Sequence, residues 1–233
     1  KDFAYMKHLF VFYRACKMLG LEPDIISPKA DLSRYKVLLA PNAFLADKVL
    51  AEKLDGFAAQ GGTLMLGVRS GFKDINDVVT EEPLPGFFRE LVGARVKQWH
   101  SLPPKVSYAF RSEVANFHPE ATFWAEGLEA DAETRSLANY TDFPFKGLAA
   151  ITEKTHGKGK VFYCGIYPQL AQAVALMCHL AASQSIPLLD IPAGLTVIRR
   201  GNSLLAMNFT EEILVFEVAS TSYDVPARDF ILL

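Results

Sequence analysis

The sequence predicts an α/β domain with a mostly parallel sheet, followed by a small antiparallel β segment. In the first part of the chain, apolar runs alternate with amphipathic helical stretches, an order that is typical of a parallel sheet. These apolar runs are continuous, which favours strands covered on both faces. After residue 187, prolines and short alternating runs take over, and they predict antiparallel strands.

Helices are predicted where apolar residues recur three or four positions apart. Residues 5–19 show this spacing and end at Gly20, a typical C-terminal cap. Phe10, Val11 and Met18 lie off the main stripe, so we expect this helix to be buried on more than one side. Further helices are predicted over 45–62, 84–93 and 168–184.

Strands are predicted in the remaining apolar runs. The strongest are YKVLLAP (35–41) and TLMLGV (63–68), while PDIIS (23–27) is a shorter candidate. A looser pattern from 94 to 146 contains strands at ARVKQW and KVSYAF, and residues 147–167 predict a hairpin.

The last part of the chain predicts a separate small unit. Its strands are LTVIRR, SLLAMNF and ILVFEVA. We place a boundary near residue 187, which divides the chain into domains 1–186 and 187–233. Since about 45 residues rarely form a stable core alone, we expect the second part to dock on the first or to be the remnant of a small β-sandwich.

Composition excludes several classes of function. Lys and Arg total 24 and Asp and Glu total 26, a balance without the basic character expected of a nucleic-acid partner. The sequence contains no run of about 18 apolar residues, so no membrane span is predicted. Cys16, Cys164 and Cys178 form no Cys-x-x-Cys pair, and the five histidines are scattered, so we expect no disulfide framework, metal or cofactor. The compartment stays open, with a cytoplasmic location slightly favoured.

The stretch GGTLMLGVRSGFKD (61–74) resembles two chemical motifs and satisfies neither. Gly62 and Gly67 have the spacing of a phosphate-binding loop, but Val68 and Arg69 stand where that loop needs lysine and serine or threonine. The order GVRSG places Ser70 one position away from the nucleophile of a GxSxG turn. We therefore predict a helix end, a buried strand and a tight exit from that strand.

The loop after this strand carries the candidate site. Open α/β sheets bind ligands at the carboxyl ends of their strands, where residues 69–83 are expected to lie. Arg69, Ser70, Lys73 and Asp74 are the candidate residues for a ligand or an interface. A small-molecule or sugar-binding module is accordingly one alternative function.

Enzymatic chemistry is weakly supported by the residues themselves. Cys164 precedes a predicted helix, and an amidotransferase-like enzyme would use it as a nucleophile if His156 or another base lay beside it. Trp99 and Trp124 are expected in the core rather than against a sugar, and His179 is expected to be structural. The acidic residues considered as glycosidase pairs are expected to be solvated in loops; they are Glu81, Glu82, Glu113, Glu120 and Glu126.

Taken together, the motifs resemble a known family. FYRACKMLGLEPDIISPKADLSRYKVLLAPNAFL, GGTLMLGVRSGFKDINDVV, LPGFFRELVGARV and GLAAITEKTHGKGKVFYCGIYP follow the order found in the middle, trimerisation domain of glycoside hydrolase family 42 β-galactosidases. GLTVIRRGNSLLAMNFTEEILVFEV is similar to that family's small C-terminal β-domain.

This resemblance implies a three-layer fold similar to flavodoxin and the class I glutamine amidotransferases, and a homo-oligomer, specifically a trimer. The family's catalytic (β/α)8 barrel takes about 250 residues, so this chain is expected to lack it and to hold no catalytic residue. The resemblance further implies a non-catalytic region of a longer hydrolase that meets its carbohydrate substrate through that barrel.

Overall fold

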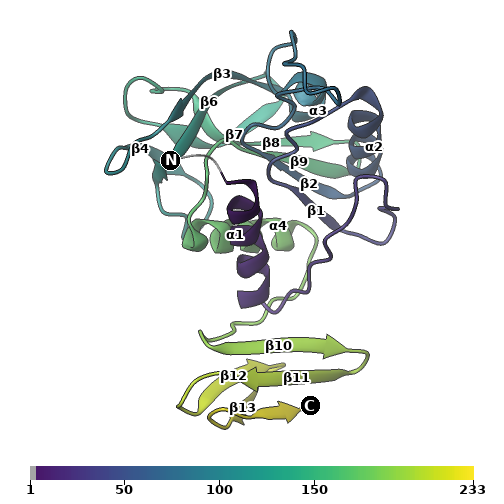
Figure 1. Ribbon diagram of the computed structural model, residues 1–233, viewed down its shortest axis with the longest axis vertical. Helices are drawn as coiled ribbons and strands as arrows, with labels where there is room; N and C mark the ends of the chain where they lie inside the picture. The colour runs from purple at the N-terminus through teal and green to yellow at the C-terminus, as the bar shows by residue number, and fades with distance from the viewer. Residues whose placement is uncertain (1–3) are drawn as a thin grey trace.

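Parallel pairing is confined to one side of a large mixed sheet. The computed structural model describes residues 4–233, and its nine-stranded sheet follows the order β1-β2-β9-β8-β7-β4-β5, with β3 and β6 attached beside this path (Figure 1). β1 (Val37–Ala40), β2 (Thr63–Gly67) and β9 (Gly159–Cys164) are parallel. The antiparallel strands are β3 (Ala94–Ser101), β4 (Ser107–Ser112), β5 (Glu120–Thr122), β6 (Trp124–Ala130), β7 (Thr134–Tyr140) and β8 (Ala149–His156).

The prediction of a mostly parallel sheet is therefore wrong beyond β1, β2 and β9. A parallel neighbour requires a long crossover, which the helix between β1 and β2 supplies. From β3 to β9 the connections contain no helix, and β8 and β9 are joined by a two-residue turn, which makes them antiparallel. The strands predicted at ARVKQW and KVSYAF and the hairpin predicted over 147–167 are confirmed as parts of this antiparallel half.

Helices cover both faces of the parallel half (Figure 1). They are α1 (Tyr5–Met18), α2 (Lys48–Ala59), α3 (Arg89–Val92), which follows the 3-10 turn Gly86–Phe88, and α4 (Leu170–Ser183). Met65 of β2 shares a buried core with Phe12 of α1, whereas its neighbour Leu64 shares the opposite core with Leu54 of α2. Successive strand residues point to opposite faces, so the continuous apolar run of β2 is buried on both sides, as predicted.

The helix boundaries follow local capping chemistry. α2 begins after Asp47, whose carboxylate accepts a 2.7 Å hydrogen bond from the Leu50 N–H, and it ends before Gly61. α3 ends at Gly93, which has φ 65, a left-handed conformation that glycine adopts readily. No helix within residues 4–233 has both the length and the apolar character needed to cross a membrane.

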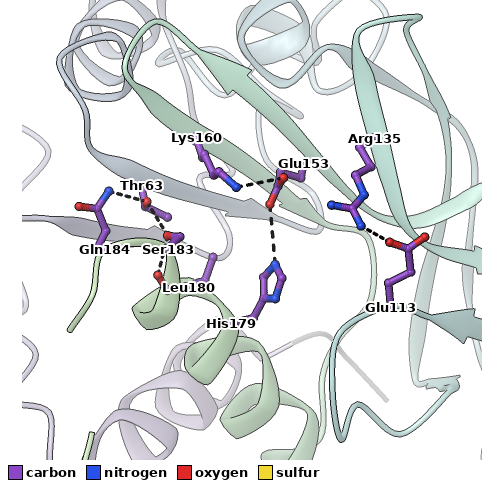
Figure 2. A network of polar contacts seen from close by, with 9 residues as sticks. All are labelled: Thr63, Glu113, Arg135, Glu153, Lys160, His179, Leu180, Ser183 and Gln184. Carbon is purple, nitrogen blue, oxygen red and sulfur yellow. Dashed lines mark hydrogen bonds and ion pairs between the residues drawn. The ribbon is translucent and has the colours of Figure 1, made fainter. Parts of the chain in front are cut away.

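Polar contacts fasten α4 to the sheet (Figure 2). Glu153 of β8 accepts a 3.2 Å hydrogen bond from the Lys160 ammonium, and its other oxygen lies 3.7 Å from His179 Nε2 on α4. At the end of α4, Ser183 and Gln184 both contact the Thr63 hydroxyl, at 3.0 and 2.9 Å. His179 therefore lies between α4 and the sheet, in contact with Glu153.

The predicted strand at PDIIS (23–27) does not form. β1 is the edge strand of the sheet, and an apolar groove of about 840 Å³ is lined by residues of β1, of α1 and of the stretch 21–28. The segment 23–27 belongs to no helix or strand, and Ile25 is exposed. Apolar character alone does not make a strand when no neighbouring edge lies within hydrogen-bonding distance.

The C-terminal strands form their own small core. β10 (Leu195–Arg200), β11 (Ser203–Asn208) and β14 (Phe230–Leu232) make one antiparallel sheet, and β12 (Leu214–Val218) and β13 (Thr221–Val225) make a hairpin. Val197, Ala206 and Phe216 are buried among these strands. The unit lies beyond the C-terminal end of α1 (Figure 1), where the Arg199 N–H donates to Glu22 at 2.8 Å.

Candidate functional site

The four candidate residues follow β2 at its carboxyl end but have different roles. Ser70 is buried, and its hydroxyl accepts a 3.1 Å hydrogen bond from the Ala43 N–H, so it joins two loops rather than facing solvent. Asp74 accepts from the N–H groups of Asn76 and Val78 at 2.8 and 3.0 Å. These bonds, chiefly that from Val78, lower the pKa of Asp74.

Arg69 is held in an unusual backbone conformation. Its φ is 63, in the left-handed region that costs a non-glycine residue about 1–2 kcal/mol. The Arg69 N–H donates a 2.9 Å hydrogen bond to Glu126 Oε1. A hydrogen bond contributes about 0.5–1.5 kcal/mol, which is comparable to the strain. The turn is therefore fixed by a residue from a distant strand.

Glu126 is the central residue of this site, and it is buried with 2% of its surface exposed. Oε1 also accepts from Trp124 Nε1 at 3.0 Å, and Oε2 accepts from the Tyr163 hydroxyl at 2.8 Å. Burial raises the pKa of Glu126, while these bonds and the nearby Arg69 guanidinium oppose that shift. Its two carboxyl oxygens thus accept hydrogen bonds from groups on three separate segments of the chain.

The prediction that Glu126 is a solvated loop residue is therefore wrong. Glu126 lies on β6, where alternate residues share a face, and its same-face neighbours Trp124 and Leu128 are both buried. The signal was present in WAEGLEA, because a carboxylate between two large apolar residues at spacing two faces the core. A buried carboxylate then needs nearby donors, and the structure supplies them.

Aromatic rings surround the Arg69 side chain. The guanidinium carbon lies 4.7 Å from the Phe44 ring centroid, 5.3 Å from Trp124 and 5.9 Å from Phe72, all within cation–π range. Trp124 also stacks on Trp99, with centroids 5.0 Å apart and rings 9° from parallel. The prediction that both tryptophans are core residues is correct for Trp124, whereas Trp99 is 44% exposed.

The structure argues against Cys164 as a nucleophile. The thiol is buried, it donates to the Ile166 carbonyl at 3.6 Å, and burial raises its pKa to about 12, so it stays protonated near neutral pH. His156, the proposed base, has its Nε2 2.8 Å from Asp55. The pair needed for an amidotransferase-like reaction is therefore not assembled.

The other acidic candidates lie apart from this site. Glu113 pairs with Arg135 in an exposed contact (Figure 2), and Glu120 lies 3.9 Å from His118. Glu81 and Glu82 are exposed in the loop after β2. Within residues 4–233, no group of three or more histidines, cysteines or acidic residues is placed to hold a metal ion. The residues around Arg69 and Glu126 thus form a surface of one arginine and several aromatic rings, held in place by the hydrogen bonds to Glu126.

Comparison with known protein families gives a match over most of the chain. The family described as the β-galactosidase trimerisation domain matches residues 1–187. Two curated relatives are β-galactosidase Bga of Halorubrum lacusprofundi, 33% identical over 225 residues, and β-galactosidase BgaH of Haloferax lucentense, 31% identical over 222 residues. The matches cover 91% and 95% of this chain but 32% and 33% of those proteins. The chain thus spans about a third of the length of these relatives.

Solved structures agree with this result. The β-galactosidase of Bacillus circulans sp. alkalophilus has a TM-score of 0.90 at 25% identity, covering 99% of this chain and 37% of that protein. The polyextremophilic β-galactosidase of the Antarctic haloarchaeon Halorubrum lacusprofundi has a TM-score of 0.89 at 30% identity, covering the whole of this chain and 36% of that protein.

Proposed function

This chain belongs to the β-galactosidase trimerisation domain family, and from that membership we propose that it joins copies of a glycoside hydrolase family 42 β-galactosidase into a homo-trimer. The observation that carries the proposal is the family match over residues 1–187. The oligomer is one of identical subunits, which is the usual case for soluble assemblies.

Hydrolysis of the carbohydrate is proposed to occur outside this chain. The relatives are β-galactosidases about three times as long as the matched region, which leaves ample length for a catalytic barrel of about 250 residues. Two observations within the chain support a non-catalytic role: the Cys164 thiol is buried with a raised pKa, and the Glu126 carboxylate is engaged by internal donors.

The division of the chain belongs to the same proposal. Residues 1–186 form the trimerisation domain and 187–233 a small C-terminal β-domain, a division supported by the separate core around Phe216. The three parallel strands with helices on both faces support a relationship of this part to the flavodoxin-like and amidotransferase-like folds.

A carbohydrate contact is a second candidate, favoured by Trp99. Trp99 is 44% exposed and stacks on Trp124, a member of the Arg69 cluster, which consists of Arg69 and the rings of Phe44, Phe72 and Trp124. Exposed aromatic rings next to an arginine suit sugar rings. Titration of galactose and lactose, followed by tryptophan fluorescence of the wild type and Trp99→Ala, tests it. Saturable quenching only in the wild type supports the contact, and its absence at high sugar concentration rejects it.

The test of the main proposal is the mass of the complete polypeptide that carries this chain. Size exclusion with light scattering should give three subunit masses, and deletion of residues 1–187 should give one. The deletion should abolish assembly while the remaining polypeptide stays folded, as checked by circular dichroism. β-Galactosidase activity measured on the same samples then reports hydrolysis separately from assembly. A complete polypeptide that is monomeric at micromolar concentration contradicts the proposal.

A further inference from the structure

Five exposed aliphatic side chains gather on one surface, which we call the valine-rich surface. They come from the turn that enters α2, from the first turn of α2 and from the loop after β2, and between 46% and 72% of each is exposed: Leu45, Val49, Ile75, Val78 and Val79. Single exposed apolar residues are common, but several on two adjoining segments are typical of an interaction site.

Backbone contacts hold the two segments that carry these residues side by side. Leu45 forms a parallel bridge with Lys73, and Lys73 forms an antiparallel bridge with Val79. The Ala46 N–H donates to the Lys73 carbonyl at 2.9 Å, and the Lys73 N–H donates to the Phe44 carbonyl at 3.1 Å. The loop after β2 therefore lies against the turn that enters α2.

The loop that carries Ile75, Val78 and Val79 is braced from within. Asp74 accepts from the Val78 N–H through its carboxylate, and the Asp74 N–H donates to the Val78 carbonyl at 2.8 Å. The loop's charged side chains are also engaged locally, since Lys73 lies 2.9 Å from Asp77. A braced loop loses little conformational freedom when a partner covers it, which favours binding.

The Arg69 cluster borders this surface. Phe44 is adjacent to Leu45 and lies under the Arg69 guanidinium at 4.7 Å, and its ring stacks on Phe72, with centroids 5.5 Å apart. Protein interfaces are enriched in arginine and aromatic residues at their centres. The strained turn fixed by Glu126 thus presents the residue types of an interface beside the aliphatic group.

We propose that the valine-rich surface is the face on which a second copy of the polypeptide docks. The inference rests on the proposed function, which supplies the identity of the partner. A closed ring of three uses head-to-tail contacts, so this surface meets a different surface of the next copy. Of the earlier candidates, Arg69 contributes at the border, while Ser70, Lys73 and Asp74 hold the loop in its binding conformation.

The experiment uses Val49→Glu and Val78→Lys in the complete polypeptide, with Phe143→Glu as the control. Val49 lies in the first turn of α2, where a carboxylate is tolerated, and a lysine at 78 does not compete with Asp74 for the loop amides. Phe143 is 88% exposed in the connection between β7 and β8. Each surface variant should raise the dissociation constant of the trimer at least tenfold, measured by light scattering over a dilution series. Phe143→Glu should leave this constant unchanged.

A second measurement covers the case in which a charged variant fails to fold. Val78→Cys should be alkylated at least tenfold more slowly in the assembled protein than after dilution to monomers, whereas Phe143→Cys should react equally in both. Variants that stay trimeric, or a Val78→Cys that reacts equally in both states, overturn the inference and leave the proposed function standing. A monomeric wild type overturns the proposed function and this inference with it.

Discussion

The backbone N–H of Arg69 donates a hydrogen bond to Oε1 of Glu126, a carboxylate that lies 57 residues further along the chain. This bond joins the turn after β2 to strand β6, and the same carboxylate receives Trp124 and Tyr163. The conformation of the candidate loop therefore depends on one buried side chain from the antiparallel half of the sheet.

Replacing Glu126 tests this dependence. Glu126→Gln places an amide NH2 group where the carboxyl oxygens accept three hydrogen bonds, so the free energy of unfolding should fall by about 1–3 kcal/mol in urea titration. Glu113→Gln breaks an exposed ion pair and should cost at most about 1 kcal/mol. Equal effects of the two substitutions contradict the role assigned to Glu126.

Gly71 and Gly201 separate steric cost from backbone strain. Both have positive φ, 66 and 59, but a Cβ on Gly71 would lie 2.0 Å from the Pro85 carbonyl oxygen, whereas one on Gly201 meets nothing within 4 Å. Gly201→Ala should cost about 1–2 kcal/mol from the left-handed backbone alone. Gly71→Ala should cost at least about 2 kcal/mol more, measured by thermal or urea unfolding. A smaller cost at Gly71 would show that the loop shifts easily.

His8 should make stability fall in mild acid. Its ring is buried, stacked 4.4 Å from Tyr167, and burial lowers its pKa from 6.5 to about 4. Between pH 6.5 and 4 the His8 imidazole binds a proton in the unfolded chain but stays neutral in the folded chain. Its contribution to the free energy of unfolding is therefore complete above pH 6.5 and declines as the pH falls toward 4. Between pH 7.5 and 5 the loss should be about 2 kcal/mol.

The measurement for His8 is a comparison of variants. His8→Phe keeps an aromatic ring and should remove this part of the pH dependence, whereas His118→Phe, at an exposed position, should leave it unchanged. Urea unfolding at several pH values gives the slopes. A slope that is the same in His8→Phe and in the wild type argues against a neutral buried imidazole.

Cysteine reactivity should follow burial. Burial raises the pKa of Cys16 to about 11 and that of Cys164 to about 12, whereas Cys178 is only partly buried. In native protein at pH 8, iodoacetamide should label Cys178 at least tenfold faster than the other two, as read by peptide mass spectrometry. Cys178→Ser should then be almost unlabelled until denaturant is added. Rapid labelling of Cys164 would revive the nucleophile hypothesis.

Local sequence was sufficient for most helices and for the strands of the parallel half. The period of apolar residues predicted α1, α2 and α4, and the continuous run TLMLGV predicted β2. Glycine positions marked where α3 ends and where the chain leaves β2. These features depend on interactions between residues close in sequence, or on burial that a single segment records in its own pattern.

Pairing was predicted less well, because it depends on distant segments. PDIIS has the composition of a strand but pairs with no strand of the sheet, so it forms no ladder. The sheet is mixed because the connections after residue 94 contain no crossover helix.

What the sequence alone determined was the local character of each segment and, through its ordered motifs, the family. What only the tertiary structure decided was which segments meet. RSGFKD could be placed after a strand from the sequence, but its bond to Glu126, its aromatic neighbours and its bridge to Leu45 arise from residues far apart in the chain. The physical reason is that a buried carboxylate, an edge strand and an exposed aliphatic surface are each defined by their neighbours in space.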